Sequence, residues 1–336
     1  MKIFIPFDTR IGGGTASFVN KFGDYLKKQG HFVTNSYSIN YDILFVVAQC
    51  KFRYLWDAKI KGKKIIQRLD GVYYPMSVVG KNYRFFNLHL KIIRKYFADY
   101  CIYQSKYSEK VCNIYLGAIN KPKTIIYNGV DVNTFSHEGV KCVQKDSENQ
   151  KIFVTTGRFR RADQIVPLLD MLELFRKKYD DNFVFYVIGA LTDELKKIVD
   201  NYKNLNIKCI ENVANAKLPG YLRSCDVFLF SSLNPPCPNS VIEAMSCGLP
   251  ICGIADGSML ELTEGGKNSE LVATQGEGFM EGREIDIIKM VDNFKKILDY
   301  RESYAKRSRE IAVERLGIER MAQDYLKIFN EINYSE

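Results

Sequence analysis

The sequence predicts an α/β protein built from two Rossmann-like domains with parallel sheets. The chain has 336 residues, which is long for one domain and comfortable for two. Short apolar segments rich in β-branched residues alternate with helical patterns in both halves, as in parallel sheets covered by helices. A polar segment without periodicity, residues 137–150, separates the halves, so we predict one domain at 1–148 and a second at 149–317.

The first half opens with a predicted strand at residues 2–7, followed by a glycine-rich loop and a helix. The loop contains Gly12, Gly13 and Gly14, and the apolar face of the helix contains Phe18, Phe22, Tyr25 and Leu26. Further strands are predicted at 43–48, 64–68, 100–103 and 124–126. The glycines permit close backbone approach to a phosphate or a sugar, and a simple turn is the alternative. With Ser17 in the last position they do not form G-x-G-x-x-G, which argues against a dehydrogenase.

The second half contains the most informative segment, in which a strand, a loop and a helix follow one another at residues 227–248. Strands are also predicted from Lys151 and at 184–188, 207–210 and 250–254. Asn239 or Ser240 is expected to cap the helix, whose start suits a phosphate because its backbone N–H groups are unpaired. Glu243, one turn in, could accept hydrogen bonds from a ribose diol. Alternatively, Ser240 and Glu243 form only a capping box.

Composition excludes several classes of protein. The nine cysteines include no C-x-x-C pair, and the three histidines show no metal-ligand spacing, so we expect reduced thiols and no metal site. No apolar run approaches the roughly 18 residues of a membrane span, and residues 1–7 lead into no signal-peptide core. Residues 1–150 carry 23 Lys and Arg against 11 Asp and Glu, which suggests an anionic partner for this half. No nucleic-acid-binding module is apparent, so nucleic acid is not expected as a partner.

Four segments together resemble the retaining glycosyltransferases of family 4, which have the GT-B fold and belong to the glycosyl transferases group 1. Residues 228–252, FLFSSLNPPCPNSVIEAMSCGLPIC, resemble the donor-binding segment of that family. Residues 5–33, 125–135 and 154–161 resemble, in order, its glycine-rich start, the end of its first domain and the start of its second. The resemblance implies two domains facing across a cleft, with residues 318–336 forming a helix that crosses back to the N-terminal domain. The apolar stripe of that helix is Ile318, Met321, Tyr325 and Ile328.

The resemblance also implies roles for individual residues. Arg158 would stabilise the donor diphosphate, Glu243 the ribose, and the helix start at Asn239 and Ser240 the sugar or phosphate. The nucleobase would lie near Asn212 and Val213, and Gly12, Gly13 and Gly14 would line the donor site. Asp70, after a predicted strand, would lie near the donor sugar or orient an acceptor hydroxyl, with an Asp-Gly turn as the alternative. The family needs no metal and no other cofactor, because cationic side chains and helix dipoles meet the phosphate charge.

Two positions depart from the family pattern. Asp163 occupies the place of a lysine, so Arg160 or Arg161 would supply the missing charge unless the phosphate site is weaker than usual. Pro235 occupies the place of the first glutamate of an E-x7-E pair, so Asn234 or Asn239 would replace its sugar contact. Both departures affect the donor site, and they leave a catalytically silent glycosyltransferase-like partner protein as one alternative function. A GT-B sugar-nucleotide epimerase is another.

The best candidate for an acceptor surface is the basic amphipathic segment 81–97, KNYRFFNLHLKIIRKYF. We place Phe86, Leu90, Ile93 and Phe97 on its apolar face, and Arg84, Asn87, Lys91 and Arg94 on its polar face. Such a helix rests on an anionic membrane, or it packs on the sheet and shows its charges to water. We therefore expect a cytoplasmic enzyme, with peripheral contact at the inner face of the membrane, that moves a sugar from a nucleotide-sugar donor to a glycan or lipid-linked glycan acceptor.

Overall fold

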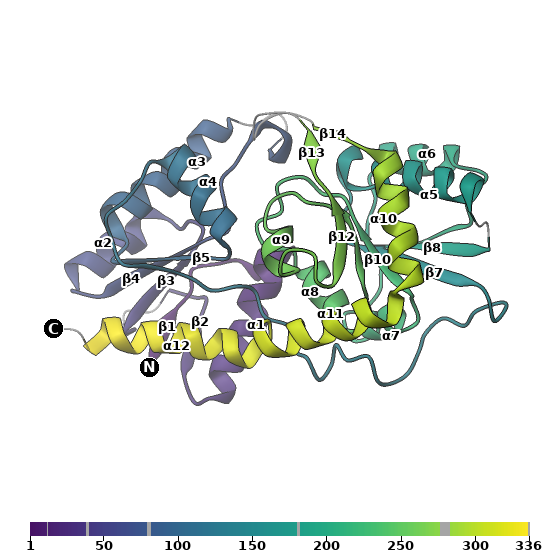
Figure 1. Cartoon of the computed structure of the whole chain (residues 1–336). Helices are drawn as coiled ribbons and strands as arrows, with labels where there is room; N and C mark the ends of the chain where they lie inside the picture. The colour runs from purple at the N-terminus through teal and green to yellow at the C-terminus, as the bar shows by residue number, and fades with distance from the viewer. Residues whose placement is uncertain (12, 38–39, 79–81, 180–181, 276–282, 335–336) are drawn as a thin grey trace. The chain divides into compact units, whose positions relative to one another are not determined.

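The computed structural model describes residues 1–336 except 12, 38–39, 79–81, 180–181, 276–282 and 335–336. The chain forms two compact units (Figure 1). Unit 1 contains Met1–Gly129 and Ile318–Glu336, and unit 2 contains Val130–Glu277 and Gly282–Gly317. The division lies upstream of residue 148 because the polar segment bonds to unit 2. The Cys142 backbone N–H donates to the Gly220 carbonyl at 3.0 Å, and that of Val143 donates to the Ser224 hydroxyl at 3.0 Å.

Unit 1 contains a six-stranded parallel sheet in the order β2-β1-β3-β4-β5-β6. The strands are β1 (Lys2–Phe4), β2 (Phe32–Thr34), β3 (Ile43–Val47), β4 (Lys64–Leu69), β5 (Tyr100–Tyr103) and β6 (Lys123–Ile125). The parallel α/β architecture of this half is therefore confirmed. β2 was not predicted, because three residues are too few to show a strand period.

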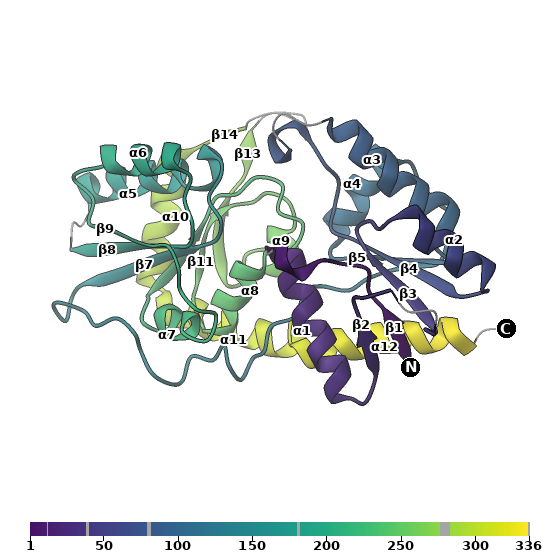
Figure 2. The ribbon, with the colours of Figure 1, turned by 180° about the vertical axis from the view of Figure 1, so that it is seen from behind.

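Helices cover both faces of this sheet, because side chains of a strand point alternately to its two faces. On one face, α1 (Gly14–Lys28) and α12 (Ile318–Tyr334) pack together, and Phe22 contacts Tyr325 with ring centroids 4.8 Å apart (Figure 2). The stripe predicted in the last helix is buried in this core. On the other face lie α2 (Phe52–Ile60), α3 (Tyr83–Ile92), the π-helix η3 (Ile93–Phe97) and α4 (Lys106–Leu116).

The polar face predicted for segment 81–97 is wrong at two positions. Asn87 and Arg94 are buried, whereas Arg84 and Lys91 are exposed; Lys81 lies outside the described residues. The α-helix changes to a π-helix at Ile93, and the wider turn shifts the helical register. The Arg94 guanidinium consequently points inward, where it donates to the Tyr103 hydroxyl at 2.8 Å and to the Asn113 side chain.

Unit 2 contains a second six-stranded parallel sheet, in the order β12-β11-β10-β7-β8-β9. The strands are β7 (Lys151–Thr156), β8 (Phe183–Ile188), β9 (Ile207–Ile210), β10 (Val227–Phe230), β11 (Ile251–Ile254) and β12 (Ser269–Val272). A short antiparallel pair, β13 (Thr274–Gln275) and β14 (Glu284–Ile285), follows. β12 was not predicted, since its sequence SELV has only half-apolar character.

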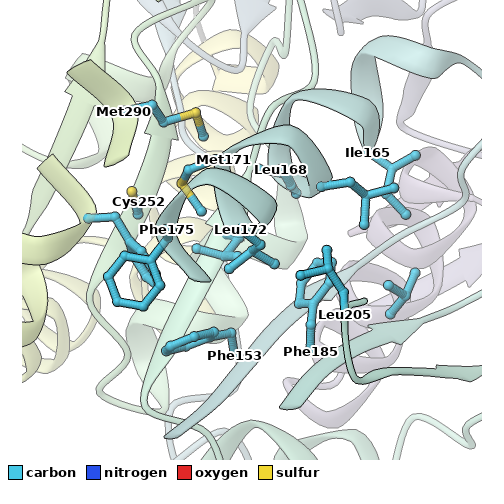
Figure 3. Packing of buried hydrophobic residues seen from close by; sticks show 14 of the residues in the cluster. Phe153, Ile165, Leu168, Met171, Leu172, Phe175, Phe185, Leu205, Cys252 and Met290 are labelled. Atoms are coloured by element: carbon cyan, nitrogen blue, oxygen red, sulfur yellow. The ribbon is translucent and has the colours of Figure 1, made fainter. Parts of the chain in front are cut away.

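The helices of unit 2 complete its core. They are α5 (Val166–Lys178), α6 (Asp193–Asn201), α7 (Leu218–Arg223), α8 (Asn239–Ser246), α9 (Met259–Leu262), α10 (Ile287–Asp299), α11 (Arg301–Arg315) and the 3-10 turn η4 (Ala162–Gln164). In Figure 3, Leu172 and Phe175 of α5 lie above Phe153 of β7, and Met290 of α10 lies toward Cys252 of β11. The sheet is thereby held rigid beneath the loops at its carboxyl edge.

Candidate functional site

The candidate site lies at the carboxyl edge of the unit 2 sheet. β7 is the first strand of this sheet along the chain. β8 and β9 lie on one side of it, and β10 lies on its other side. Such a switch point leaves a crevice between two neighbouring strand ends, where ligands bind in open α/β sheets. A cavity of about 210 Å³ lies there, lined by the ends of β7 and β10, the Pro-rich loop and the start of α8.

The start of α8 contributes Ser240 to this cavity. The helix begins at Asn239 with Pro238 in the N-cap position, and no side chain caps it. Capping by Asn239 or Ser240 is therefore wrong, and so is the capping-box alternative, because proline ends the preceding loop and leaves Ser240 inside the first turn. Glu243 lies three residues after Ser240, hence on the same side of the helix, and is half-buried. The start of α8 therefore has no side-chain cap, and the positive end of its helix dipole lies at the cavity.

The Pro-rich loop is held in place by a buried ion pair that the sequence analysis missed. Arg283 pairs with Asp256, whose other oxygen accepts the Asn234 backbone N–H at 2.9 Å. Arg283 also donates to the Asn234 side-chain oxygen at 3.0 Å. Asn234 is buried and its amide oxygen is engaged, so it does not fit the role of a sugar ligand in place of the missing glutamate. Nothing in the local sequence around Arg283 indicates this role, because its partners are far away in the chain.

Gly257 allows this loop to pack closely. It has φ +57°, and a Cβ atom at this position would lie 2.3 Å from the Pro235 carbonyl oxygen. Pro235, which occupies the place of the family glutamate, lines the cavity. The contact is therefore part of the wall of the candidate site.

The predicted phosphate ligands occupy different environments. Arg158 follows β7 between two residues that line the cavity, Gly157 and Phe159, and its side chain is exposed. Arg161 instead forms a two-point ion pair with Asp163, at 2.8 and 2.9 Å. Asp163 also accepts the Leu233 backbone N–H at 3.1 Å, so the acidic replacement fastens the β7 loop to the β10 loop. The guanidinium of Arg158 is thus more accessible to a phosphate than that of Arg161.

Other predicted donor residues lie away from this cavity. Asn212 and Val213 follow the edge strand β9 and do not line it. Gly13 and Gly14 belong to unit 1, where Gly13 precedes α1 with φ +91°; Gly12 lies outside the described residues. The structure therefore brings Ser240 and the loop around Pro235 to one cavity, with Arg158 between two of its lining residues and Glu243 one turn along α8.

Asp70 in unit 1 is part of a charged network beneath the glycine-rich loop. The carboxylate pairs with the Arg68 guanidinium and accepts from the Thr15 hydroxyl at 2.9 Å, and it is 24% exposed. Arg68 is 1% exposed and lies over the Phe18 ring at 3.8 Å. The Asp-Gly turn is thus only part of the role of Asp70. The sequence analysis missed Arg68, since a cation inside a strand usually reaches water.

The described residues contain no disulfide and no metal-binding cluster. All nine cysteines are free, and burial raises the pKa of Cys247, at the end of α8, to about 12. Within the described ranges, no three His, Cys, Asp or Glu side chains are grouped closely enough to hold a metal ion. Among the helices that the structure describes, none combines the length and apolar character needed to cross a membrane.

Comparison with known proteins identifies two curated relatives that each match about half of this chain. Capsular polysaccharide biosynthesis glycosyltransferase CapH of Staphylococcus aureus is 30% identical over 163 residues, which are 47% of this chain and 43% of CapH. A probable sucrose-phosphate synthase of Thermosipho melanesiensis is 27% identical over 172 residues, 48% of this chain and 38% of the relative. This chain therefore spans less than half the length of these curated relatives.

Solved structures show the same fold over the whole chain. Sucrose-phosphate synthase from Thermosynechococcus elongatus superposes with a TM-score of 0.79 at 13% identity, covering 100% of both chains. Anabaena HepE in complex with UDP-glucose gives a TM-score of 0.73 at 16% identity, covering 98% of this chain and 99% of HepE. The fold is that of the GT-B glycosyltransferases. Residues 141–311, half of the chain, match the family described as glycosyl transferases group 1, and the chain belongs to this family.

Proposed function

We propose that this protein is a retaining glycosyltransferase that moves a sugar from a nucleotide-sugar donor to a glycan or lipid-linked glycan acceptor. The observation that carries the proposal is the cavity at the switch point of the unit 2 sheet, into which the uncapped start of α8 opens. A diphosphate fits such a position, because the positive end of the helix dipole lies there. UDP is the nucleotide we favour, since HepE was solved with UDP-glucose. Retention is inferred from the resemblance of the donor segment to family 4.

Each donor group has a proposed partner. Arg158 and the backbone at the start of α8 stabilise the negative charge that builds on the diphosphate as the bond to the sugar breaks. Glu243 binds the ribose and Ser240 binds the sugar or phosphate, while Asn212 and Val213 approach the base. The acceptor oxygen bonds to the sugar carbon on the face that the diphosphate leaves, and the diphosphate takes its proton. No metal takes part, because cationic and dipolar groups of the chain meet the charge.

Asp70 is proposed to orient an acceptor hydroxyl or to support positive charge on the reacting sugar. The Arg68 guanidinium and the Thr15 hydroxyl, at the start of α1, both bind the Asp70 carboxylate and so fix its orientation. A carboxylate held at two points presents its remaining lone pairs in a defined direction. Arg68 is therefore a positioning residue in this proposal.

We further propose peripheral contact between unit 1 and an anionic membrane. Adjacent helices α2 and α3 expose large apolar side chains, with Trp56 59% and Phe85 65% exposed, and the Phe52 ring on α2 stacks 4.6 Å from that of His89 on α3. The basic excess of residues 1–150 supplies attraction to anionic lipid. Exposed aromatic side chains beside cations suit a membrane interface. Liposome co-sedimentation at low salt tests this part, and no binding to anionic vesicles would contradict it.

The decisive experiment measures sugar transfer or donor hydrolysis with UDP-sugars on wild type and Arg158→Ala. Loss of a side chain that stabilises the diphosphate charge should slow turnover roughly 100-fold or more, equivalent to about 3 kcal/mol. Lys197→Ala removes an exposed cation on α6 and should leave turnover unchanged. NMR of the product tests whether the anomeric configuration of the donor is kept. Full activity of Arg158→Ala would refute the proposed charge stabilisation, and absence of any turnover in wild type would favour the silent-partner alternative.

A further inference from the structure

Unit 1 contains a second and larger cavity, of about 640 Å³. It lies at the carboxyl ends of β1, β2 and β3, beside the start of α2. The chain goes from β1 to β2 on one side and then to β3 on the other side of β1, so this cavity also occupies a switch point. Its volume falls within the range of roughly 300–1,000 Å³ typical of small-molecule sites.

The entrance of this cavity carries net positive charge. Lys51 lines it at the N-cap position of α2, and its ammonium has no ion-pair partner among the residues described. No side chain caps α2, so the positive end of the helix adds to this charge. Arg10 also lines the cavity but pairs with Asp8 at 2.8 Å, so that pair contributes no net charge. The charge that would complement this cavity is therefore negative.

The wall of the cavity carries neutral polar groups that lack partners. Gln49 and His89 line it, and the Oε1 atom of Gln49 and the Nε2 atom of His89 are buried without a hydrogen bond among the described residues. Burial lowers the pKa of His89, so its ring is neutral near pH 7. Asn35 lines the cavity as well and donates to the Phe7 carbonyl at 3.0 Å, which fixes its amide. Amide groups such as those of Gln49 and Asn35 can satisfy the hydroxyl groups of a sugar.

We propose that this cavity binds a sugar that carries an anionic group, either a carboxylate or a phosphate. Lys51 and the start of α2 hold the anionic group, while the amides of Gln49 and Asn35 hold hydroxyls. The inference rests on the proposed function in one respect, namely that this sugar is the acceptor. It adds the chemical class of the acceptor and the residues that select it.

Isothermal titration of the full chain with glucuronate, glucose 6-phosphate and glucose tests this inference. Both anionic sugars should bind at least tenfold more tightly than glucose, and the tighter of the two identifies the anionic group. Lys51→Ala should remove this preference, and Gln49→Leu should weaken all three sugars. Lys28→Ala removes an exposed cation at the far end of α1 and should change nothing.

Equal affinity for glucose and the anionic sugars would overturn the inference, as would an unchanged preference in Lys51→Ala or no binding of any of the three. UDP titrated into the same samples separates this result from the proposed function. Binding of the anionic sugars without UDP binding would overturn the donor site and leave the cavity assignment standing. If UDP binds but the three sugars bind equally or not at all, the donor site stands and the cavity assignment is overturned.

Discussion

Replacing Arg68 with methionine should destabilise unit 1 strongly, because the Arg68 side chain bonds to residues from four separate segments of this unit. The guanidinium donates to the Asn128 side chain at 2.7 Å, to Gln104 at 3.1 Å and to the Tyr325 hydroxyl at 3.1 Å, and it pairs with Asp70. Removing one partner of a buried ion pair costs about 3–5 kcal/mol. Asp70 can turn toward water, since it is 24% exposed, so we expect the lower end, about 3 kcal/mol.

Urea unfolding followed by tryptophan fluorescence measures this change in unit 1 specifically, because the single tryptophan of the chain, Trp56, lies on α2. Arg84→Met is the matched control, since Arg84 is exposed on α3. Its free energy of unfolding should stay within about 0.5 kcal/mol of wild type. Tyr325→Phe removes one hydrogen bond to the same guanidinium and should cost about 1.5–3 kcal/mol. A loss below 1 kcal/mol in Arg68→Met, or no difference from the control, would refute the reasoning.

Three further predictions concern unit 2. Gly257→Ala should lower the free energy of unfolding by at least about 1–2 kcal/mol and weaken UDP binding, because a Cβ at φ +57° would lie 2.3 Å from the Pro235 carbonyl oxygen. Thermal denaturation and UDP titration measure the two effects, and wild-type values for both would contradict the close contact. Arg283→Met should free the Pro-rich loop from Asp256 and raise the KM for the donor more than it lowers kcat, whereas an unchanged KM would show that the loop needs no such anchor. Hydrogen bonding from Arg307, with help from Lys267 and Arg315, lowers the pKa of Glu264 from 4.5 to about 2. In this pH interval the unfolded chain binds the additional proton, so stability should fall as the pH falls from 4.5 toward 2. Urea titrations of Glu264→Gln should show a shallower fall, and an unaltered slope would contradict this.

Most strands could be predicted from the sequence because a buried strand has a recognisable apolar sequence. The segments at 100–103 and 227–230 agree with β5 and β10 residue for residue, since continuous apolar runs mark strands covered on both faces. The segment at 207–210 also agrees with β9, although β9 is a partly exposed edge strand that contains Lys208. β2 and β12 leave a weaker record, being short and partly polar at the sheet edge. The polar face of segment 81–97 failed for two different reasons. The Asn87 side chain is buried where it bonds to the Tyr73 backbone, at 2.8 and 2.9 Å. At Arg94 the π-helix at Ile93–Phe97 changes the helical period, which a fixed 3.6-residue pattern cannot express.

The candidate site was predicted where its residues are close in sequence. The strand, loop and helix around Ser240 could be recognised from 25 consecutive residues, and the cavity lies there. The supporting interactions could not be predicted, because Arg283 and Asp256 meet through folding, as do Arg68 and Tyr325. Likewise, the pairing of Arg161 with Asp163 depends on side-chain direction, which composition does not reveal.

In the proposed mechanism, the unit 2 cavity binds the nucleotide-sugar donor. The most direct test is a thermal-shift measurement with UDP, GDP, ADP, CDP, dTDP and NAD on wild type and Glu243→Ala. A nucleotide at 100 times its Kd stabilises the folded protein by about 2.7 kcal/mol. One nucleoside diphosphate, UDP by preference, should raise the melting temperature of wild type, and Glu243→Ala should lose this effect. No shift with any nucleoside diphosphate, or an equal shift in the variant, would contradict the proposed mechanism.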